Sequence, residues 1–146
     1  MLVRLHLDNL SKTIRSKVMR AIRSANTRPE LCVRRTVYSL GYRYRLTGSK
    51  LPGRPDLVFR SRRKVIFVHG CFWHVHKGCA LSHVPKYEYW RNKLARNVAR
   101  DSATRRALKH SGWKSLILWE CELSQLERVS SKISSFLGPP APRNAT

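Results

Sequence analysis

Residues 64–79, with the sequence KVIFVHGCFWHVHKGC, constrain the fold and chemistry of this chain more than any other stretch. The segment begins as an apolar run typical of a buried β-strand. It then places three His, two Cys, one Phe and one Trp within the eleven residues 69–79. Packing alone does not require so many potential metal ligands beside two large aromatic side chains. We therefore interpret the segment as metal-organised, with the rest of the chain supplying the other parts of a site.

The charge of the chain indicates a polyanionic partner. Lys and Arg outnumber Asp and Glu by 30 to 8, which gives a formal net charge of +22 over 146 residues. Such an excess destabilises a compact protein by self-repulsion, and a bound nucleic acid offsets it. A merely basic protein and a membrane-surface binder are the alternatives, but no basic amphipathic stretch dominates the chain. Residues 1–10 mix charged with apolar side chains, so we expect neither a signal peptide nor a membrane span, but a cytoplasmic protein.

Periodicity and turn residues predict one α/β domain over residues 12–137, after an extension at 1–11 and before a Pro-rich disordered tail at 138–146. The length suits a single hydrophobic core. Residues 56–60 and 64–69 should form a hairpin, and 113–119 is apolar enough for the centre of a sheet. Helices are expected at 12–24, 27–40, 86–111 and 124–137, and strands at 42–46, 56–60, 64–69 and 113–119.

The first candidate site consists of three Cys and one His, namely Cys71, His76, Cys79 and Cys121. The first three have C-x4-H-x2-C spacing, and the fourth follows the predicted strand at 113–119. Thiolates and an imidazole in this ratio match the tetrahedral ligands of structural Zn²⁺. His74 and His83 lie near enough in the sequence to be alternative imidazole ligands. Cys32 has no neighbouring His or Cys, so we expect a buried free thiol there.

The second candidate site combines acidic residues with imidazoles, namely Asp56, His69, His74 and Asp101. Hydrolysis of a phosphodiester needs an activated water, a charge clamp on the phosphate and help for the leaving oxygen. Asp56 could hold Mg²⁺ together with a backbone carbonyl of the neighbouring strand. His74 could accept the proton of the water while Asp101 fixes its tautomer, which leaves His69 to contact the phosphate.

Each residue of this second site also has an ordinary structural explanation. Asp56 could cap a turn, Asp101 could form an i,i+4 ion pair with Arg105, and each His could occupy a common surface or core position. Glu30 is fully explained as part of a capping box with Thr27. On spacing alone, these alternatives stay open.

Large apolar side chains form a third candidate set, namely Met19, Phe72, Trp73 and Trp90. Such side chains on a rigid cationic surface are suited to insertion between base pairs. The alternative is a small core packed over the zinc site. We favour insertion, because Trp90 opens a basic helix beside the loop that carries Phe72 and Trp73.

Several segments together resemble the very short patch repair (Vsr-type) DNA mismatch endonucleases. The resemblance covers roughly residues 12–123, and its HGCFWH motif is highly specific. Residues 16–35, SKVMRAIRSANTRPELCVRR, resemble the N-terminal region of that family. The other matching segments are LPGRPDLVF at 51–59, KVIFVHGCFWHVHKGC at 64–79, YWRNKLARNVARD at 89–101 and GWKSLILWEC at 112–121.

The resemblance implies a restriction-endonuclease-like core, with a mixed central sheet flanked by helices and a structural zinc. It implies Mg²⁺-dependent nicking of one strand of double-stranded DNA, on the 5′ side of the T in a T:G mismatch. Such mismatches arise when 5-methylcytosine is deaminated. We expect a monomer that does not bind membranes, and a contact with other mismatch-repair proteins is left open.

The resemblance also implies roles for individual residues. Asp56 and the carbonyl of Val68 would hold Mg²⁺. His74, paired with Asp101, would be the general base. His69 would assist at the phosphate, and Glu30 would hold metal-bound water. The implied DNA contacts are intercalation by Met19, Phe72 and Trp73, stacking by Trp90, and base contacts by Lys93 and Asn97.

Two departures from the family pattern and two competing functions accompany this resemblance. Val68 stands where some members have Thr, and one more residue separates His74 from Cys79 than in some members. A ββα-metal (HNH-like) nuclease would use His69 or His74 as base and Asn97 to orient the metal site. A zinc-stabilised DNA-binding module without catalysis is the other alternative. The target sequence around the mismatch does not follow from the resemblance.

Overall fold

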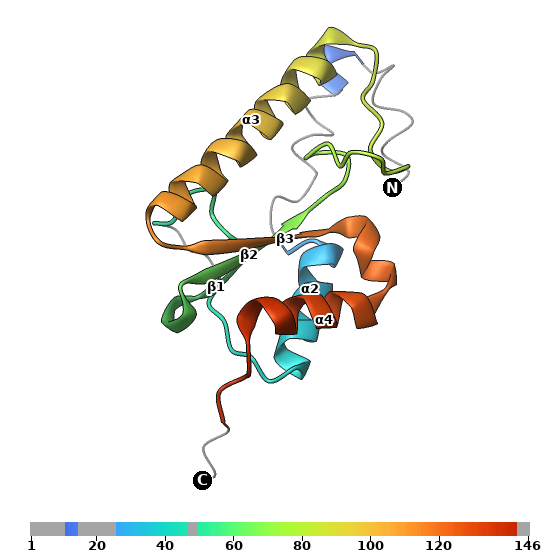
Figure 1. The fold of residues 1–146 in the computed structure, drawn as a ribbon. Coiled ribbons are helices and arrows are strands. Elements are labelled where there is room, and N and C mark those ends of the chain that lie inside the picture. The colour runs from blue at the N-terminus through green and yellow to red at the C-terminus, as the bar shows by residue number, and fades with distance from the viewer. Residues whose placement is uncertain (1–10, 15–25, 47–49, 143–146) are drawn as a thin grey trace.

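The structure contains a small mixed sheet with helices on both of its faces (Figure 1). It is a computed structural model that describes residues 11–14, 26–46 and 50–142. The strands are β1 (Leu57–Phe59), β2 (Lys64–His69) and β3 (Lys114–Trp119), in the order β1-β2-β3. The helices are α2 (Arg28–Ser39), α3 (Glu88–His110) and α4 (Leu126–Leu137).

The predicted hairpin is confirmed. Strands β1 and β2 are antiparallel, with Leu57 opposite Ile66, and a 3₁₀ turn at Arg60–Arg62 joins them. Arg63 closes this turn with a φ of 52°. Strands β2 and β3 are parallel over six residue pairs that end at His69 opposite Trp119. A parallel pair needs a crossover connection, and α3 lies within it.

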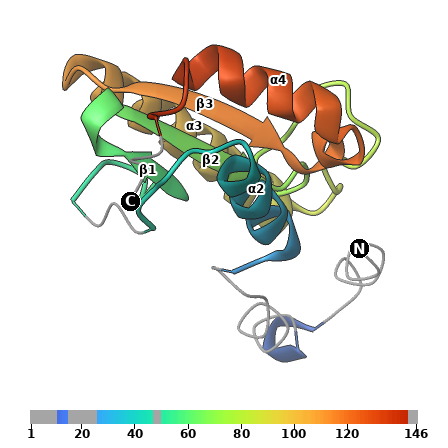
Figure 2. The same ribbon diagram turned by 90° about the horizontal axis from the view of Figure 1, so that it is seen from below.

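Strand β3 lies at the edge of the sheet among the described strands, so its predicted central position is wrong; β2 is central. The apolar sequence of β3 has another cause. Helix α3 covers one face of the sheet, and α2 and α4 cover the other (Figures 1 and 2). A strand covered on both faces needs apolar side chains in both directions, whether or not it has two neighbouring strands.

Alternate strand residues pack into two separate cores. On the side of α2 and α4, Leu57, Ile66 and Leu118 join a cluster completed by the helices. On the side of α3, Val65 and Phe67 pack with Leu108. This period of two is what a pleated sheet with two covered faces requires.

Helix α2 begins as its sequence predicts. The side chain of Thr27 caps the helix by accepting the Glu30 backbone N–H at 3.4 Å, and Pro29 lies in the first turn. The Glu30 side chain is buried and accepts instead from the backbone N–H of Asn26, at 2.9 Å. The N-terminus of α2 therefore carries a buried carboxylate.

Two sequence predictions fare differently at the N-terminal half. Residues 42–46 do not form a strand, because only Arg45 pairs with β1, through two hydrogen bonds of 2.9 Å with Val58. Tyr42 instead turns into the core and donates its hydroxyl to the carbonyl of Gly138. Residues 12–14 are helical, while the rest of the predicted first helix, including Met19, lies outside the described residues. Within the described ranges, no helix is long and apolar enough to cross a membrane.

Candidate active site and metal centre

Both candidate sites lie at one end of the sheet, where β2 and β3 finish side by side. Their last residues, His69 and Trp119, are opposite each other. Cys71 follows β2 by two residues and Cys121 follows β3 by two, so the parallel register brings the two cysteines together. Asp56 precedes the antiparallel β1 and therefore lies at this same end.

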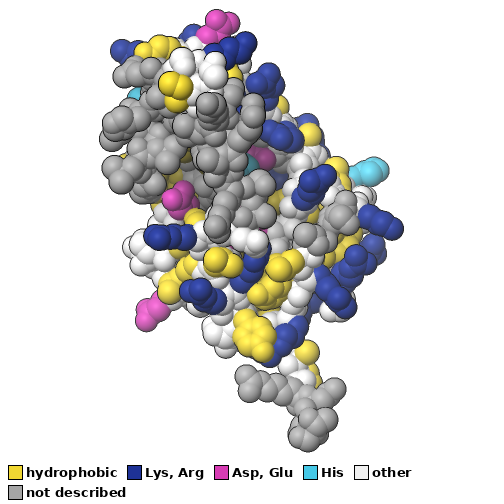
Figure 3. Space-filling model, turned by 180° about the vertical axis from the view of Figure 1, so that it is seen from behind, with side chains coloured by type: hydrophobic (Ala, Val, Ile, Leu, Met, Phe, Trp, Pro, Cys, Tyr) yellow, Lys and Arg dark blue, Asp and Glu magenta, His cyan; other side chains and the backbone are white. Residues whose placement is uncertain are grey.

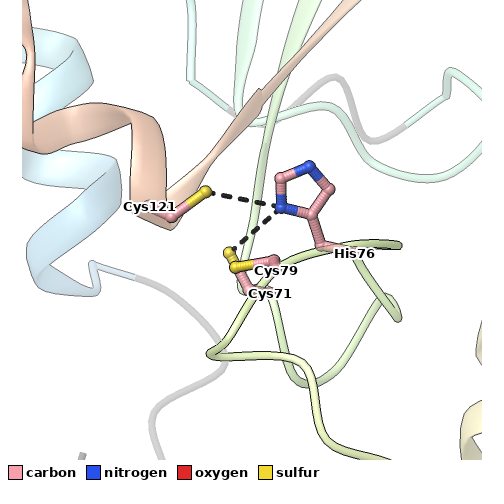
Figure 4. Close-up of side chains that lie close together, drawn as sticks. All are labelled: Cys71, His76, Cys79 and Cys121. Atoms are coloured by element: carbon pink, nitrogen blue, oxygen red, sulfur yellow. Dashed lines mark hydrogen bonds between the residues drawn. The ribbon is translucent and has the colours of Figure 1, made fainter.

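The first cluster brings all four predicted ligands together (Figure 4). The ligand atoms of Cys71, His76, Cys79 and Cys121 all lie within 4.8 Å of one another. His76 Nδ1 is 3.6 Å from the sulfur of Cys71 and 3.4 Å from the sulfur of Cys121. Ligand atoms about 2.0–2.3 Å from a tetrahedral ion would be separated by about 3.6 Å. The cluster can therefore hold a metal ion.

His76 is the imidazole of this cluster, and its ring orientation is fixed by Trp119. The two rings are stacked, with centroids 4.1 Å apart and planes 5° apart. His74 contacts Asp101 instead (below), and His83 is exposed. Sequence reasoning missed Trp119, although an aromatic residue two positions before a Cys at a strand end is a usable signal.

The thiols of the cluster have raised pKa values. Burial is the main cause that raises the pKa of Cys71 to about 12; a backbone hydrogen bond with Cys121 opposes this rise, and hydrogen bonds with the thiols of Cys121 and Cys79 contribute to it. Burial also raises the pKa of Cys121. Crowded thiols hold their protons because charged neighbours in a buried site repel each other. A divalent cation would displace those protons on binding.

The loop reverses direction between its two histidines. Val75 separates His74 from His76 and has a φ of 52°, in the left-handed region that β-branched residues rarely adopt. The backbone N–H of His74 donates to Gly70 at 3.2 Å and that of His76 donates to Cys71 at 3.0 Å. The left-handed residue thus directs one histidine to the metal cluster and the other to the acidic group described next. Strain of this kind is typical of functional segments.

The second cluster contains His69, His74 and Asp101, whose ligand atoms also lie within 4.8 Å of one another. His74 Nδ1 is 2.6 Å from Asp101 Oδ2, and both side chains are about one-quarter exposed, at 27% and 23%. The alternative i,i+4 pair of Asp101 with Arg105 is not formed among the salt bridges of the described residues. With Nδ1 engaged by the carboxylate, Nε2 is the nitrogen left to accept a proton.

His69 is buried beside His74. The two imidazoles are stacked, with centroids 3.7 Å apart. Burial, together with smaller effects of His74 and Arg105, lowers the pKa of His69 to about 3. Its Nδ1 is buried without a hydrogen bond to the described residues. His69 is therefore neutral at ordinary pH and keeps unused hydrogen-bonding capacity.

Asp56 lies immediately before β1 and beside the end of β2. Its Oδ2 accepts the backbone N–H of Val68 at 2.7 Å, which places the carboxylate beside the Val68 peptide. The pKa of Asp56 is raised to about 6, mainly by burial. The Val68 hydrogen bond and the charge of Arg34 oppose this rise, and the charge of Glu30 contributes to it. A bound cation would stabilise the ionised form of a carboxylate in this environment.

A glycine holds the loop before Asp56 against α3. Gly53 has a φ of 75°, and a Cβ there would lie 2.3 Å from Cγ2 of Thr104. Only glycine permits both this backbone conformation and this approach. The contact joins the Asp56 loop to the helix that carries Asp101.

A cleft of about 1040 Å³ joins these groups. The N-terminus of α2 with Glu30, the Asp56 loop, the end of β2 and one side of α3 form its walls. Arg54, Arg100 and Arg105 also line it. Figure 3 shows Lys and Arg side chains spread over one face of the molecule with few acidic ones among them. Such a basic surface suits a polyanionic ligand.

Three of the predicted DNA-contacting residues, Phe72, Trp73 and Trp90, pack against one another. Phe72 and Trp73 are half-buried, and both lie in ring contact with Trp90, which has no exposed surface. Asn97 donates from Nδ2 to the carbonyl of Trp73 at 2.9 Å, and Lys93 is half-buried on the same helix. The aromatic residues therefore form the small core over the loop, and their contact with bases stays a prediction.

Arg34 is a cleft residue that sequence reasoning did not single out. Its Nη2 lies 3.2 Å from Glu30 Oε2. The i,i+4 spacing of an acid and a base on one helix was the available signal. Because such pairs are common on solvated helix faces, only the burial of Glu30 distinguishes this one.

Comparison with known proteins shows the family of this chain. The family model for "DNA mismatch endonuclease Vsr" matches residues 7–81. The Type II nicking enzyme V.XorIIP of Xanthomonas oryzae pv. oryzae is 47% identical over 134 residues, which cover 90% of this chain and 98% of that protein. The DNA mismatch endonuclease Vsr of Escherichia coli K12 is 42% identical over 127 residues, which cover 86% and 81%. The chain belongs to the Vsr family of DNA mismatch endonucleases.

Proposed function

We propose that this endonuclease nicks one strand of double-stranded DNA on the 5′ side of the T in a T:G mismatch, in a reaction that depends on Mg²⁺. Relatives named as a nicking enzyme and as a DNA mismatch endonuclease support this proposal. The net charge of +22 supports a DNA substrate. The restriction-endonuclease-like core implied by the sequence would house the site at the end of the mixed sheet.

One observation carries the proposal: His74 Nδ1 lies 2.6 Å from Asp101 Oδ2 in the cleft that Asp56 also lines. This is the geometry of a general base whose tautomer a carboxylate fixes. In the proposed reaction, a water attacks the phosphorus and one P–O bond of the backbone breaks. His74 Nε2 takes the proton of the attacking water, and the departing oxygen takes a proton from solvent water. Asp101 stabilises the imidazolium that forms.

The oxygen ligands near Asp56 suit Mg²⁺, which prefers carboxylates, carbonyls and water. Asp56 and the carbonyl of Val68 would hold the ion. Glu30, 6% exposed, would accept a hydrogen bond from a water bound to it. When present, Mg²⁺ would supply a Lewis acid that neutralises charge on the phosphate.

His69 would assist at the phosphate as a neutral group. Because burial lowers the pKa of His69 to about 3, it can donate a hydrogen bond but adds no positive charge. A neutral His69 also places no positive charge beside the proton that the stacked His74 would accept. His69 would therefore help keep His74 available as a base.

We propose Zn²⁺ as the metal of the Cys71, His76, Cys79 and Cys121 cluster. Three thiolates and one imidazole would close a tetrahedral shell, which leaves no position for a substrate. Such an ion would be structural. It would tie the loop after β2 to the end of β3 and so hold His74 in place.

For the DNA, we propose that Phe72 and Trp73 insert beside the mismatch, together with Met19. Trp90 would stack there, and Lys93 and Asn97 would contact bases. The ring contacts of Phe72 and Trp73 with Trp90 support a rigid aromatic unit rather than independent side chains. Insertion of such a unit needs an unstacked base step, which a mismatch offers at lower cost.

The test is incubation of the protein with T:G duplexes of varied flanking sequence, with Mg²⁺ or with EDTA, beside matched duplexes. We expect a single nick 5′ of the T, only with Mg²⁺ and only on some flanking sequences. Binding without any nick would favour the non-catalytic module. An HNH-like site would use Asn97 to orient the metal site, so loss of nicking in Asn97→Ala with full activity in Asp56→Ala would favour that alternative.

A further inference from the structure

We infer that Arg34 is a positioning residue of the active site: by bridging Asn26 and Glu30 it fixes the Glu30 carboxylate so that one oxygen remains free for the metal-bound water. This inference rests on the proposed function and deepens it. Arg34 lies on α2 and lines the cleft together with Asp56. It is not needed to explain the helix, because Thr27 already provides the cap.

The three residues form a closed network around one oxygen atom. Glu30 Oε2 accepts from the Asn26 backbone N–H at 2.9 Å and from Arg34 Nη2 at 3.2 Å. Arg34 Nη1 also donates to Asn26 Oδ1 at 2.9 Å. Asn26 has a φ of 58°, a left-handed conformation that Asn tolerates better than most residues. The guanidinium of Arg34 thus links Asn26, which precedes the N-cap residue of α2, to Glu30 in the first turn of the helix.

This network distinguishes the two oxygens of Glu30. Both donors reach Oε2, and within the described part of the chain no donor reaches Oε1. Because the side chains of Glu30 and Arg34 are only 9% and 15% exposed, water does little to reorient the carboxylate. Oε1 is therefore the oxygen available to a ligand in the cleft.

Arg34 also supplies a positive charge near two acidic residues, Glu30 and Asp56. Glu30 and Asp56 line the same cleft, and the charge of Glu30 disfavours ionisation of Asp56. The guanidinium opposes this effect at Asp56. Its Nε is buried and unpaired among the described residues. An unpaired buried N–H lowers stability, so a purely stabilising role does not explain an arginine here.

The chain offers matched variants. Arg34→Ala removes the bridge, and Arg35→Ala removes the same charge from an exposed neighbour on α2. Arg34→Lys keeps the charge, but one ammonium cannot form the two-ended bridge. Asn26→Gly keeps the left-handed backbone and the N–H to Glu30, and removes only the Oδ1 partner of Arg34.

The first readout is single-turnover nicking of a T:G duplex, with duplex affinity measured in EDTA. We expect Arg34→Ala to nick about 10- to 100-fold more slowly than the wild type, the effect typical of losing a hydrogen bond to a charged group. Affinity should change no more than in Arg35→Ala. Arg34→Lys should recover part of the rate, and Asn26→Gly should lose less than Arg34→Ala. Equal rates for Arg34→Ala and Arg35→Ala, or full recovery with Lys, would overturn the inference.

The second readout does not need activity. Urea unfolding of Arg34→Ala, Glu30→Gln and the double variant forms a mutant cycle. We expect the two sites to be coupled by at least about fivefold in the unfolding constant. Additive effects would overturn the bridge even if the enzyme nicks. An inactive wild type with a coupled pair would instead refute the proposed function and leave the bridge intact.

Discussion

The imidazoles of His69 and His74 are stacked, with centroids 3.7 Å apart and planes 7° apart. Within the described part of the chain, only one of these rings has a carboxylate partner, Asp101 at 2.6 Å from His74 Nδ1. The other, His69, is buried, and its pKa is lowered to about 3. Two rings of the same chemistry therefore have different surroundings. These surroundings suit the different roles proposed for them, His74 as the base and His69 as a neutral group.

Replacing His74 with Ala should abolish most nicking without weakening DNA binding. General bases contribute about 10²- to 10⁴-fold to rate, so we expect a loss in that range. Single-turnover nicking with Mg²⁺ measures it. The control is His83→Ala, which removes an exposed histidine from the same long loop and should stay within about twofold of the wild type. Comparable losses in both variants would contradict the role given to His74.

Replacing Asp56 with Asn should stabilise the metal-free protein at neutral pH while abolishing activity. The folded pKa of Asp56 is raised from 3.8 to about 6. Between those values the folded state binds more protons than the unfolded state, so the carboxyl lowers stability progressively as pH rises through that window. Above pH 6 the full penalty is present, about 1–3 kcal/mol.

Urea unfolding in EDTA at several pH values checks this prediction. The gain of Asp56→Asn over the wild type should be near zero at about pH 4 and largest at about pH 7. His69 is present in both proteins, so its own opposite contribution cancels. Glu127→Gln, at an exposed position of α4, serves as control and should give no such rise. A constant difference across the range would show that burial does not disfavour the Asp56 charge.

Removing Cys121 should release the structural metal. We expect about one zinc per chain in the purified wild type, and almost none in Cys121→Ala, which should also unfold at a much lower temperature. Elemental analysis and thermal unfolding measure both effects. Cys32→Ala is the control, because Cys32 lies on α2 outside the cluster. Full zinc in Cys121→Ala would contradict the four-ligand assignment.

Replacing Trp119 with Ala should weaken zinc binding without removing a ligand. The indole stacks on His76 at 4.1 Å and also contacts His69 at 5.2 Å, edge to face. Loss of groups that orient metal ligands typically lowers affinity by about 10- to 100-fold. A competition assay with a zinc chelator measures the change. Trp113→Ala, just before the other end of the same strand, should lower stability but leave zinc affinity near wild type; equal zinc loss in both would contradict an orienting role.

Local patterns predicted much of this molecule. The apolar runs at 64–69 and 113–119 predicted strands that the structure confirms as β2 and β3. The capping residues predicted the start of α2 to within one residue. Segment 42–46 alternates between apolar and basic residues, YRYRL, but forms only one bridge, at Arg45. Alternation shows which side chains can share a face, but not whether a neighbouring strand is there to pair with.

By itself, the sequence determined the ligand types, their spacing, the basic charge and the family. The tertiary structure decided which residues meet. The parallel register of β2 and β3 brings Cys121 to Cys71 and His76. Helix packing buries Glu30 beside the half-buried Arg34, and it also buries Trp90 completely. The division has a physical reason: helix and strand preferences arise from neighbours in the chain, whereas burial and ionisation depend on contacts between residues far apart in it.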